Sequence, residues 1–166
     1  MKKIMMVNDK CDNCGDCVKA CMEIYGVSRI SILEHDGNYL PIVCQHCSSA
    51  PCMQVCPVNA IEFRGEVVYL DGEKCIGCGL CALACPFGAI VMADKAHKCV
   101  LCIERDEPAC VKACSKRCLE VISVEDAIWD KKIKNIENFA KLTLNKKIEN
   151  KGGLFSKITV NARVKF

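Results

Sequence analysis

Residues 75–86 read Cys-Ile-Gly-Cys-Gly-Leu-Cys-Ala-Leu-Ala-Cys-Pro, so four cysteines follow the spacing Cys-x2-Cys-x2-Cys-x3-Cys and a proline comes directly after the last. Three cysteines at this spacing let one tight loop supply three corners of a cubane cluster, while the fourth ligates the other cluster of a pair. Gly77 and Gly79 carry no Cβ atoms, so the backbone can approach the cluster closely. Pro86 turns the chain away after the last ligand. The stretch therefore predicts cysteine ligands to a [4Fe–4S] cluster.

Three further groups of four cysteines share this organisation, because each begins with Cys-x2-Cys and ends with Cys-x3-Cys. The four groups are Cys11, Cys14, Cys17 and Cys21; Cys44, Cys47, Cys52 and Cys56; Cys75, Cys78, Cys81 and Cys85; and Cys99, Cys102, Cys110 and Cys114. An internal repeat of this kind indicates duplicated ferredoxin units. The sequence predicts that these sixteen cysteines ligate the iron of four [4Fe–4S] clusters.

Two other uses of the cysteines are weaker. In the second and fourth groups the spacing before the third cysteine is longer, with four residues between Cys47 and Cys52 and seven between Cys102 and Cys110. Two Cys-x2-Cys pairs can form a Cys₄ zinc site, but a zinc ribbon needs two pairs and not four quartets. A disulfide scaffold fits poorly, because the chain has 17 cysteines, an odd number, and residues 1–10 lack the apolar run of a secretory signal.

Cys118 is the seventeenth cysteine and has no place in the quartets. We interpret it as a small buried residue beside a cluster; the alternatives are that it replaces Cys114 as a ligand or is a reactive thiol. His46 lies inside the ligand loop of the second group. Because each quartet already has four cysteines, we expect His46 to lie outside the ligand set, behind the ligands or facing solvent.

Charge is distributed unevenly along the chain. Residues 1–130 carry 13 Lys and Arg against 18 Asp and Glu, a balance of −5, whereas residues 131–166 carry 10 against 2, a balance of +8. Four [4Fe–4S]²⁺ clusters with their thiolates would add about −8 to the first part. The loaded protein would then be acidic despite its formal charge of +3, which disfavours nucleic acid as a partner.

Short β-type runs separate the cysteine groups, at residues 4–7, 29–33, 39–43 and 67–70. The sequences at residues 35–38 and 64–66 are typical of hairpin turns. No apolar stretch reaches the roughly eighteen residues that span a bilayer, so we expect a soluble, cytoplasmic protein without a transmembrane segment.

The pattern changes from about Ser123. Apolar residues recur there at spacings of three and four, which predicts an amphipathic helix; they are Trp129, Ile133, Ile136, Ala140 and Leu144. Gly152-Gly153 would end the helix, and strict alternation of apolar and polar residues over 158–166 predicts a half-buried strand.

Three stretches, residues 44–52, 75–90 and 98–110, resemble the polyferredoxins, the four-cluster electron-transfer subunits that serve molybdenum or tungsten oxidoreductases, formate dehydrogenases, hydrogenases and carbon monoxide dehydrogenases. The resemblance covers roughly residues 3–122. It implies an α+β fold of two ferredoxin-like modules, each with two [4Fe–4S] clusters. Residues 1–122 would form this double body, and residues 123–166 would be a basic helix–strand tail for packing or assembly.

The resemblance also implies which cysteines share a cluster, because in that family the first group exchanges its fourth ligand with the fourth group, and the second with the third. One module would hold two sets: Cys11, Cys14, Cys17 and Cys114; and Cys99, Cys102, Cys110 and Cys21. The other module would hold two more: Cys44, Cys47, Cys52 and Cys85; and Cys75, Cys78, Cys81 and Cys56.

The implied function is electron transfer without catalysis, in the cytoplasm of an anaerobe. Single electrons would pass through the four clusters to or from a catalytic partner of the formate dehydrogenase, tungsten or molybdenum aldehyde oxidoreductase, hydrogenase or carbon monoxide dehydrogenase type. Other copies of the chain are an alternative partner for the tail. A free polyferredoxin carrier and a zinc-binding interaction module remain the alternative functions.

Overall fold

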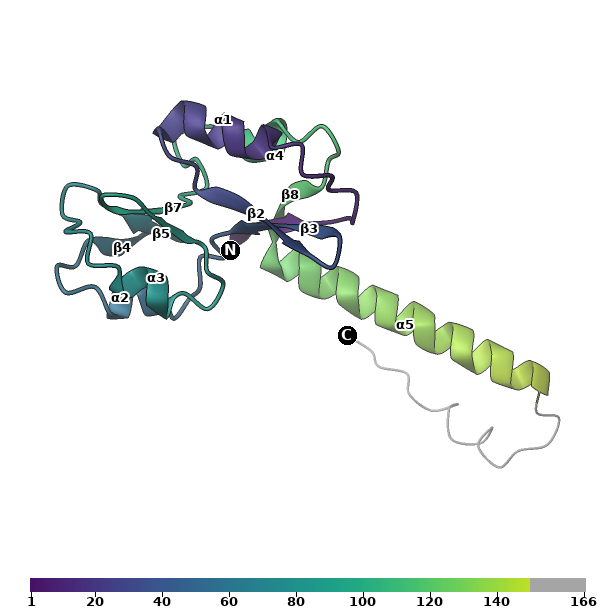
Figure 1. Ribbon diagram of the computed structural model, residues 1–166. Helices are drawn as coiled ribbons and strands as arrows, with labels where there is room; N and C mark the ends of the chain where they lie inside the picture. Colours follow the sequence, from purple (N-terminus) through teal and green to yellow (C-terminus); the bar gives the residue numbers. More distant parts are fainter. Residues whose placement is uncertain (150–166) are drawn as a thin grey trace. The chain divides into compact units, whose positions relative to one another are not determined.

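The computed structural model describes the backbone of residues 1–149 and the side chains of residues 1–141 (Figure 1). The chain divides into two compact units, Met1–Val124 and Glu125–Phe166. The predicted glycine break and the strand at residues 158–166 lie outside the described residues, as does the side chain of Leu144.

The first unit is built from small antiparallel sheets and short helices, so its fold class is α+β as predicted. Its four two-stranded sheets pair β1 (Lys2–Met6) with β8 (Leu119–Ser123), β2 (Ile30–His35) with β3 (Asn38–Val43), β4 (Ile61–Arg64) with β5 (Val67–Leu70), and β6 (Ile90–Met92) with β7 (Ala96–Lys98). The first of these sheets brings the two ends of the unit together, and in it Ile4 lies opposite Val121.

The β2–β3 hairpin shows why the turn sequence matters. His35 pairs with Asn38, so Asp36 and Gly37 alone form the loop. Both have positive φ, 50° and 75°, which is the backbone of a type I′ turn and favours Asp-Gly. The predicted turn is confirmed here.

Four short helices carry cysteines at their starts and ends: α1 (Asp16–Tyr25), α2 (Pro51–Gln54), α3 (Leu80–Ala84) and α4 (Ala109–Lys112). Helix α1 packs against α4, and α2 packs against α3 (Figure 1). Buried side chains form two groups. One surrounds Ile4, Ile30 and Leu119, and the other surrounds Ile61 and Val68.

The four predicted strands are present, displaced by no more than two residues at either end. Strands β4, β6, β7 and β8 were not expected from the sequence. They are three to five residues long, which is too short to show a clear alternation of apolar and polar residues.

The second unit contains α5 (Val124–Glu149), which confirms the predicted helix. Its large apolar side chains are exposed, including Trp129 at 63%, Ile136 at 68% and Phe139 at 69%. No helix within residues 1–149 is both long and apolar enough to cross a membrane.

Gly77 provides a test of how tightly the loop at residues 75–78 is packed. Both Gly77 (φ 71°) and Gly79 (φ 79°) lie in the left-handed region, but a Cβ atom on Gly77 would approach the backbone oxygen of Asp94 to 2.4 Å, whereas one on Gly79 would meet nothing within 4 Å. We expect Gly79→Ala to cost about 1–2 kcal/mol of unfolding free energy from backbone strain alone. Gly77→Ala should lower the thermal unfolding midpoint clearly further, because backbone atoms must also shift. Equal midpoints for the two variants would contradict the close approach.

Candidate metal centres

The cysteines of the four groups line four cavities in the first unit, with three from one group and one from another in each. We name them cavities A to D. Cavity A is lined by Cys11, Cys14, Cys17 and Cys114, and cavity B by Cys21, Cys99, Cys102 and Cys110. Cavity C is lined by Cys44, Cys47, Cys52 and Cys85, and cavity D by Cys56, Cys75, Cys78 and Cys81.

The short helices explain why each group serves two cavities. Cys17 and Cys21 lie one turn apart on α1, yet Cys17 lines cavity A and Cys21 lines cavity B. On the neighbouring helix, Cys110 lies on α4 and lines cavity B, while Cys114 follows its end and lines cavity A. Cavities A and B are therefore neighbours that share one helix pair.

The pair α2 and α3 relates cavities C and D in the same way. Cys52 on α2 lines cavity C, and Cys56, just beyond that helix, lines cavity D. Cys81 on α3 lines cavity D, and Cys85, at its end, lines cavity C. The same exchange of the last cysteine thus occurs twice.

Cavities B and C meet through Cys99 and Cys44. Burial raises the pKa of the Cys99 thiol to about 12, and the nearby Cys44 thiol contributes to the increase. Both cysteines belong to the same group of buried side chains. The four cavities therefore follow one another in the order A, B, C, D.

The cavities fit a group of several atoms better than a single ion. Their empty volumes, which include space open to solvent, are nearly equal at about 310, 320, 330 and 310 Å³. Within the described part of the chain, no three His, Cys, Asp or Glu side chains converge as ligands of one metal ion. Four cysteines around a cavity of this kind are the ligand set of a [4Fe–4S] cluster.

Backbone amides point at the sulfur atoms of six of these cysteines. Three of the fourth cysteines accept a hydrogen bond from the amide four residues later: Ala60 to Cys56 at 3.3 Å, Ala89 to Cys85 at 3.4 Å and Cys118 to Cys114 at 3.2 Å. Cys21, Cys44 and Cys99 accept theirs from Arg29, His46 and Leu101 at 3.2–3.4 Å. Such donors stabilise a thiolate more than a thiol.

Most other atoms around the sulfurs are apolar, and this disfavours the thiolate. Burial raises the pKa of Cys17 to about 11, and it also raises the pKa values of Cys52, Cys81 and Cys110. A buried thiolate needs a compensating positive charge, and bound iron supplies one. The amide donors and the low polarity together fit a metal cluster.

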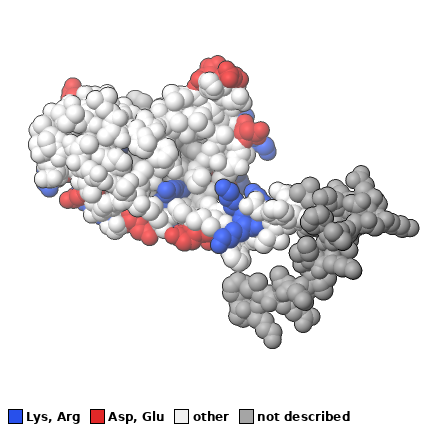
Figure 2. All heavy atoms as spheres, turned by 90° about the horizontal axis from the view of Figure 1, so that it is seen from below, with Lys and Arg blue, Asp and Glu red and all other residues white. Residues whose placement is uncertain are grey.

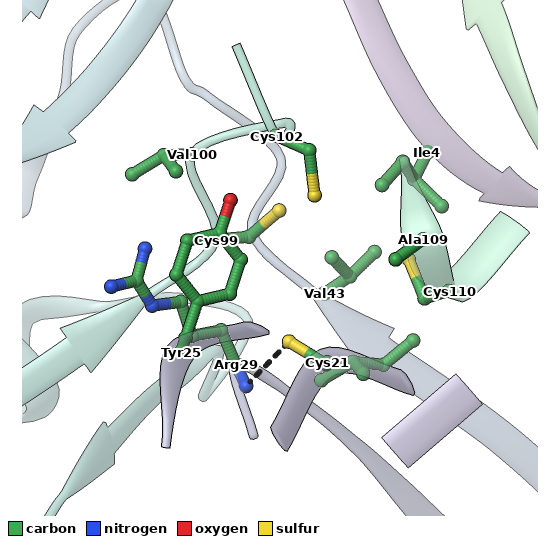
Figure 3. A pocket seen from close by; sticks show the side chains of 11 residues that line it. Ile4, Cys21, Tyr25, Arg29, Val43, Cys99, Val100, Cys102, Ala109 and Cys110 are labelled. Carbon is green, nitrogen blue, oxygen red and sulfur yellow. Dashed lines mark hydrogen bonds between the residues drawn. The ribbon is translucent and has the colours of Figure 1, made fainter. Parts of the chain in front are cut away.

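Cavity B has two residues that the sequence patterns did not single out, Tyr25 and Arg29 (Figure 3). The Arg29 guanidinium lies 3.8 Å from the centre of the Tyr25 ring. Burial raises the pKa of the Tyr25 hydroxyl, and a hydrogen bond to the Cys102 side chain raises it further.

Cys118 and His46 are both buried. Cys118 is 1% exposed and lines cavity A beside Cys114. His46 is fully buried, so it does not face solvent; its Nδ1 accepts a hydrogen bond from the Val68 amide at 3.2 Å, and Nε2 has no partner among the described residues. Burial lowers the pKa of His46 to about 3, with a further contribution from Lys98, so the ring is neutral at pH 7.

Comparison with known proteins identifies the family. The family description "4Fe-4S dicluster domain" matches residues 35–124. An uncharacterized ferredoxin of Methanocaldococcus jannaschii is 63% identical over 166 residues, which covers 99% of this chain and 98% of that protein.

Two relatives belong to named oxidoreductases. The iron–sulfur subunit of a Wolinella succinogenes formate dehydrogenase is 45% identical over 91 residues, 48% of this chain and 46% of that one. Component A of Escherichia coli hydrogenase-4 is 43% identical over 86 residues, 48% of this chain and 42% of that one. Their names describe an iron–sulfur subunit of the first enzyme and a component of the second. The chain belongs to the [4Fe–4S] ferredoxins with a dicluster domain, the family of these electron-transfer subunits.

Proposed function

We propose that this protein relays single electrons through four [4Fe–4S] clusters, one in each of cavities A to D, to or from a catalytic oxidoreductase. The observation that carries the proposal is the row of four cavities, each lined by three cysteines of one group and one of another. Each cluster would supply one-electron chemistry. The protein would hold the clusters in order, keep water away from the inner two and adjust their potentials through amide donors.

We assign the two helix pairs to two ferredoxin-like modules within residues 1–122. Groups one and four would form the module with cavities A and B, and groups two and three the module with cavities C and D. The exchange of the last cysteine within each helix pair supports this division.

The exposed cysteines mark the ends of the proposed electron path. Cys14 in cavity A and Cys78 in cavity D are exposed, whereas Cys44, Cys99 and Cys110 in the middle cavities are buried. Electron transfer weakens steeply with distance, so partners must approach the ends. The end at Cys78 carries exposed apolar side chains, Ile76 at 63%, Leu80 at 44% and Leu83 at 87%, which suits a stable contact with a catalytic subunit.

The region after residue 122 would serve assembly. Apolar side chains on α5 are exposed on a helix that also carries Lys131, Lys132 and Lys134. A partner groove that accepts an amphipathic helix would bury these apolar groups. Acidic and basic side chains form small, separate groups on the face of the molecule shown in Figure 2, so the described surface there offers no continuous basic platform for nucleic acid.

A free carrier is the second candidate. The ferredoxin of Methanocaldococcus jannaschii matches this chain over nearly its full length, and its printed name specifies no enzyme complex. Native size-exclusion of a cell extract separates the two functions, because a bound subunit elutes with its partner and a free carrier elutes near 18 kDa.

The cluster content can be measured directly. Anaerobically purified protein should be brown and contain about sixteen irons and sixteen sulfides, four of each per cluster. A colourless protein that contains zinc would contradict the proposal.

Cys114 and Cys118 provide a matched pair for the ligand assignment, because both line cavity A. Cys114→Ala should lose the cluster in that cavity and reduce the iron content by about a quarter, since a cubane needs all four thiolates. Cys118→Ala should keep the full iron content. The reverse result would identify Cys118 as the ligand in place of Cys114.

The contact at the Cys78 end can be tested with a surface charge. Leu83→Asp should leave the iron content unchanged and slow electron exchange with the co-purified partner at least tenfold, because a carboxylate would be desolvated against an apolar contact. Leu33→Asp is the control, since Leu33 is 55% exposed on the β2–β3 hairpin. Equal electron-exchange rates for the two variants would place the contact elsewhere.

Deletion of residues 125–166 tests the assembly role. The truncated protein should retain its irons, because every cavity lies within the first unit. Its complex with the partner should dissociate more readily on size-exclusion. Loss of iron on truncation would show that this region stabilises the cluster-binding body itself.

A further inference from the structure

Lys98, at the end of β7, has an unusual position for a lysine. Its side chain is 1% exposed and heads the set of largest fully buried side chains in the described chain. The ammonium donates hydrogen bonds to the backbone oxygens of Val68 and, at 2.9 Å, Cys99. Lysine is almost never fully buried unless it is paired, so this position needs an explanation.

The contacts of Lys98 satisfy hydrogen bonds but supply no negative charge. Carbonyl oxygens are dipoles, and no carboxylate forms an ion pair with Lys98 among the side chains of residues 1–141. An ammonium buried without a counter-charge costs several kcal/mol. An ammonium also has three donors, and only two meet these oxygens. The buried Lys98 ammonium therefore needs an anion nearby.

The anions that this position offers are the proposed clusters. Lys98 lines cavity C together with Cys44, Cys47, Cys52 and Cys85. The next residue, Cys99, lines cavity B. The Lys98 ammonium donates to the carbonyl of this cysteine at 2.9 Å. The cation thus lies at the junction between cavities B and C.

This junction differs from the other two steps of the path. Cavities A and B share the helix pair α1 and α4, and cavities C and D share α2 and α3. Between B and C no helix is shared. Lys98 instead connects the two sides, since its ammonium bonds Val68 on β5 and the carbonyl of Cys99.

We propose that Lys98 is a positioning residue that acts as the buried counter-ion of the two inner clusters and makes both easier to reduce. A [4Fe–4S]²⁺ cluster with four thiolates is a dianion, and reduction adds one more negative charge. A fixed cation stabilises the more negative form. The inner clusters would hold an electron better than they would without Lys98, which favours its passage between the modules. This inference rests on the function proposed above.

Three substitutions of Lys98 separate its charge from its hydrogen bonds. Lys98→Gln keeps donor groups but removes the charge, Lys98→Met removes both, and Lys98→Arg keeps the charge. Lys95→Met is the matched control, because Lys95 also donates to a backbone oxygen, that of Gly72, but lies on the surface and lines neither cavity B nor cavity C.

The measurement is a redox titration followed by electron paramagnetic resonance, on full-length protein whose iron content has been determined. Two of the four midpoint potentials should fall in Lys98→Gln and Lys98→Met, each by at least tenfold in its one-electron equilibrium, about 59 mV. Lys98→Arg and Lys95→Met should leave all four potentials near the wild-type values. The fall should persist in 1 M salt, since a buried charge is screened little.

Two other outcomes would overturn the inference, and a third would overturn the proposed function. Unchanged potentials in a fully loaded Lys98→Gln protein would overturn the inference and leave the proposed function intact. Iron loss in Lys98→Gln and Lys98→Arg alike would also overturn it, since Lys98 would then be required only for folding. A wild-type protein without [4Fe–4S] signals would instead remove the proposed function.

Discussion

The exchange of the fourth cysteine between groups is the constraint on which the rest of the structure depends. Each cavity takes three cysteines from one group and one from another group elsewhere in the chain. Cavities A and B therefore require residues near both ends of the first unit to meet, and the β1–β8 sheet brings those ends together. Sheets of two strands are marginally stable by themselves. Bound clusters would supply much of the missing stability, as structural metals do in other small domains.

Burial and charge act against each other throughout this unit. The apolar surroundings raise the pKa of Cys17 in the outer cavity A to about 11 and that of Cys99 in the inner cavity B to about 12. Amide donors offset part of that cost at individual sulfurs. Lys98 provides a full charge where amide dipoles alone would leave two neighbouring anions uncompensated. The most buried cation among the described residues thus lies between cavities B and C, in which no cysteine is exposed.

The sequence predicted the chemistry of the site better than the details of the fold. The spacing of the cysteines identifies the ligand loops directly, because a cubane cluster restricts the positions of its four thiolates. The sequence also predicted the Asp36-Gly37 turn, since few residues adopt the positive φ angles that this turn requires. Strands β6 and β7 were missed because three residues are too few to show a period of two. Lys98 was missed for a different reason: a lysine is expected on the surface, and only the tertiary fold brings Val68 within reach of its ammonium.

The two units of the chain respond to different requirements. In the first, nearly every large apolar side chain that is buried lies beside a cysteine or a strand that positions one. In α5 the large apolar side chains of Trp129, Ile133 and Ile136 are exposed, although these residues repeat at helical spacing. A helix that bound no further surface would gain nothing from an apolar repeat, because water favours charged and polar groups on an isolated helix. The repeat therefore argues that α5 is shaped by a contact beyond the residues described, whereas the cysteine-rich unit is shaped by what it encloses.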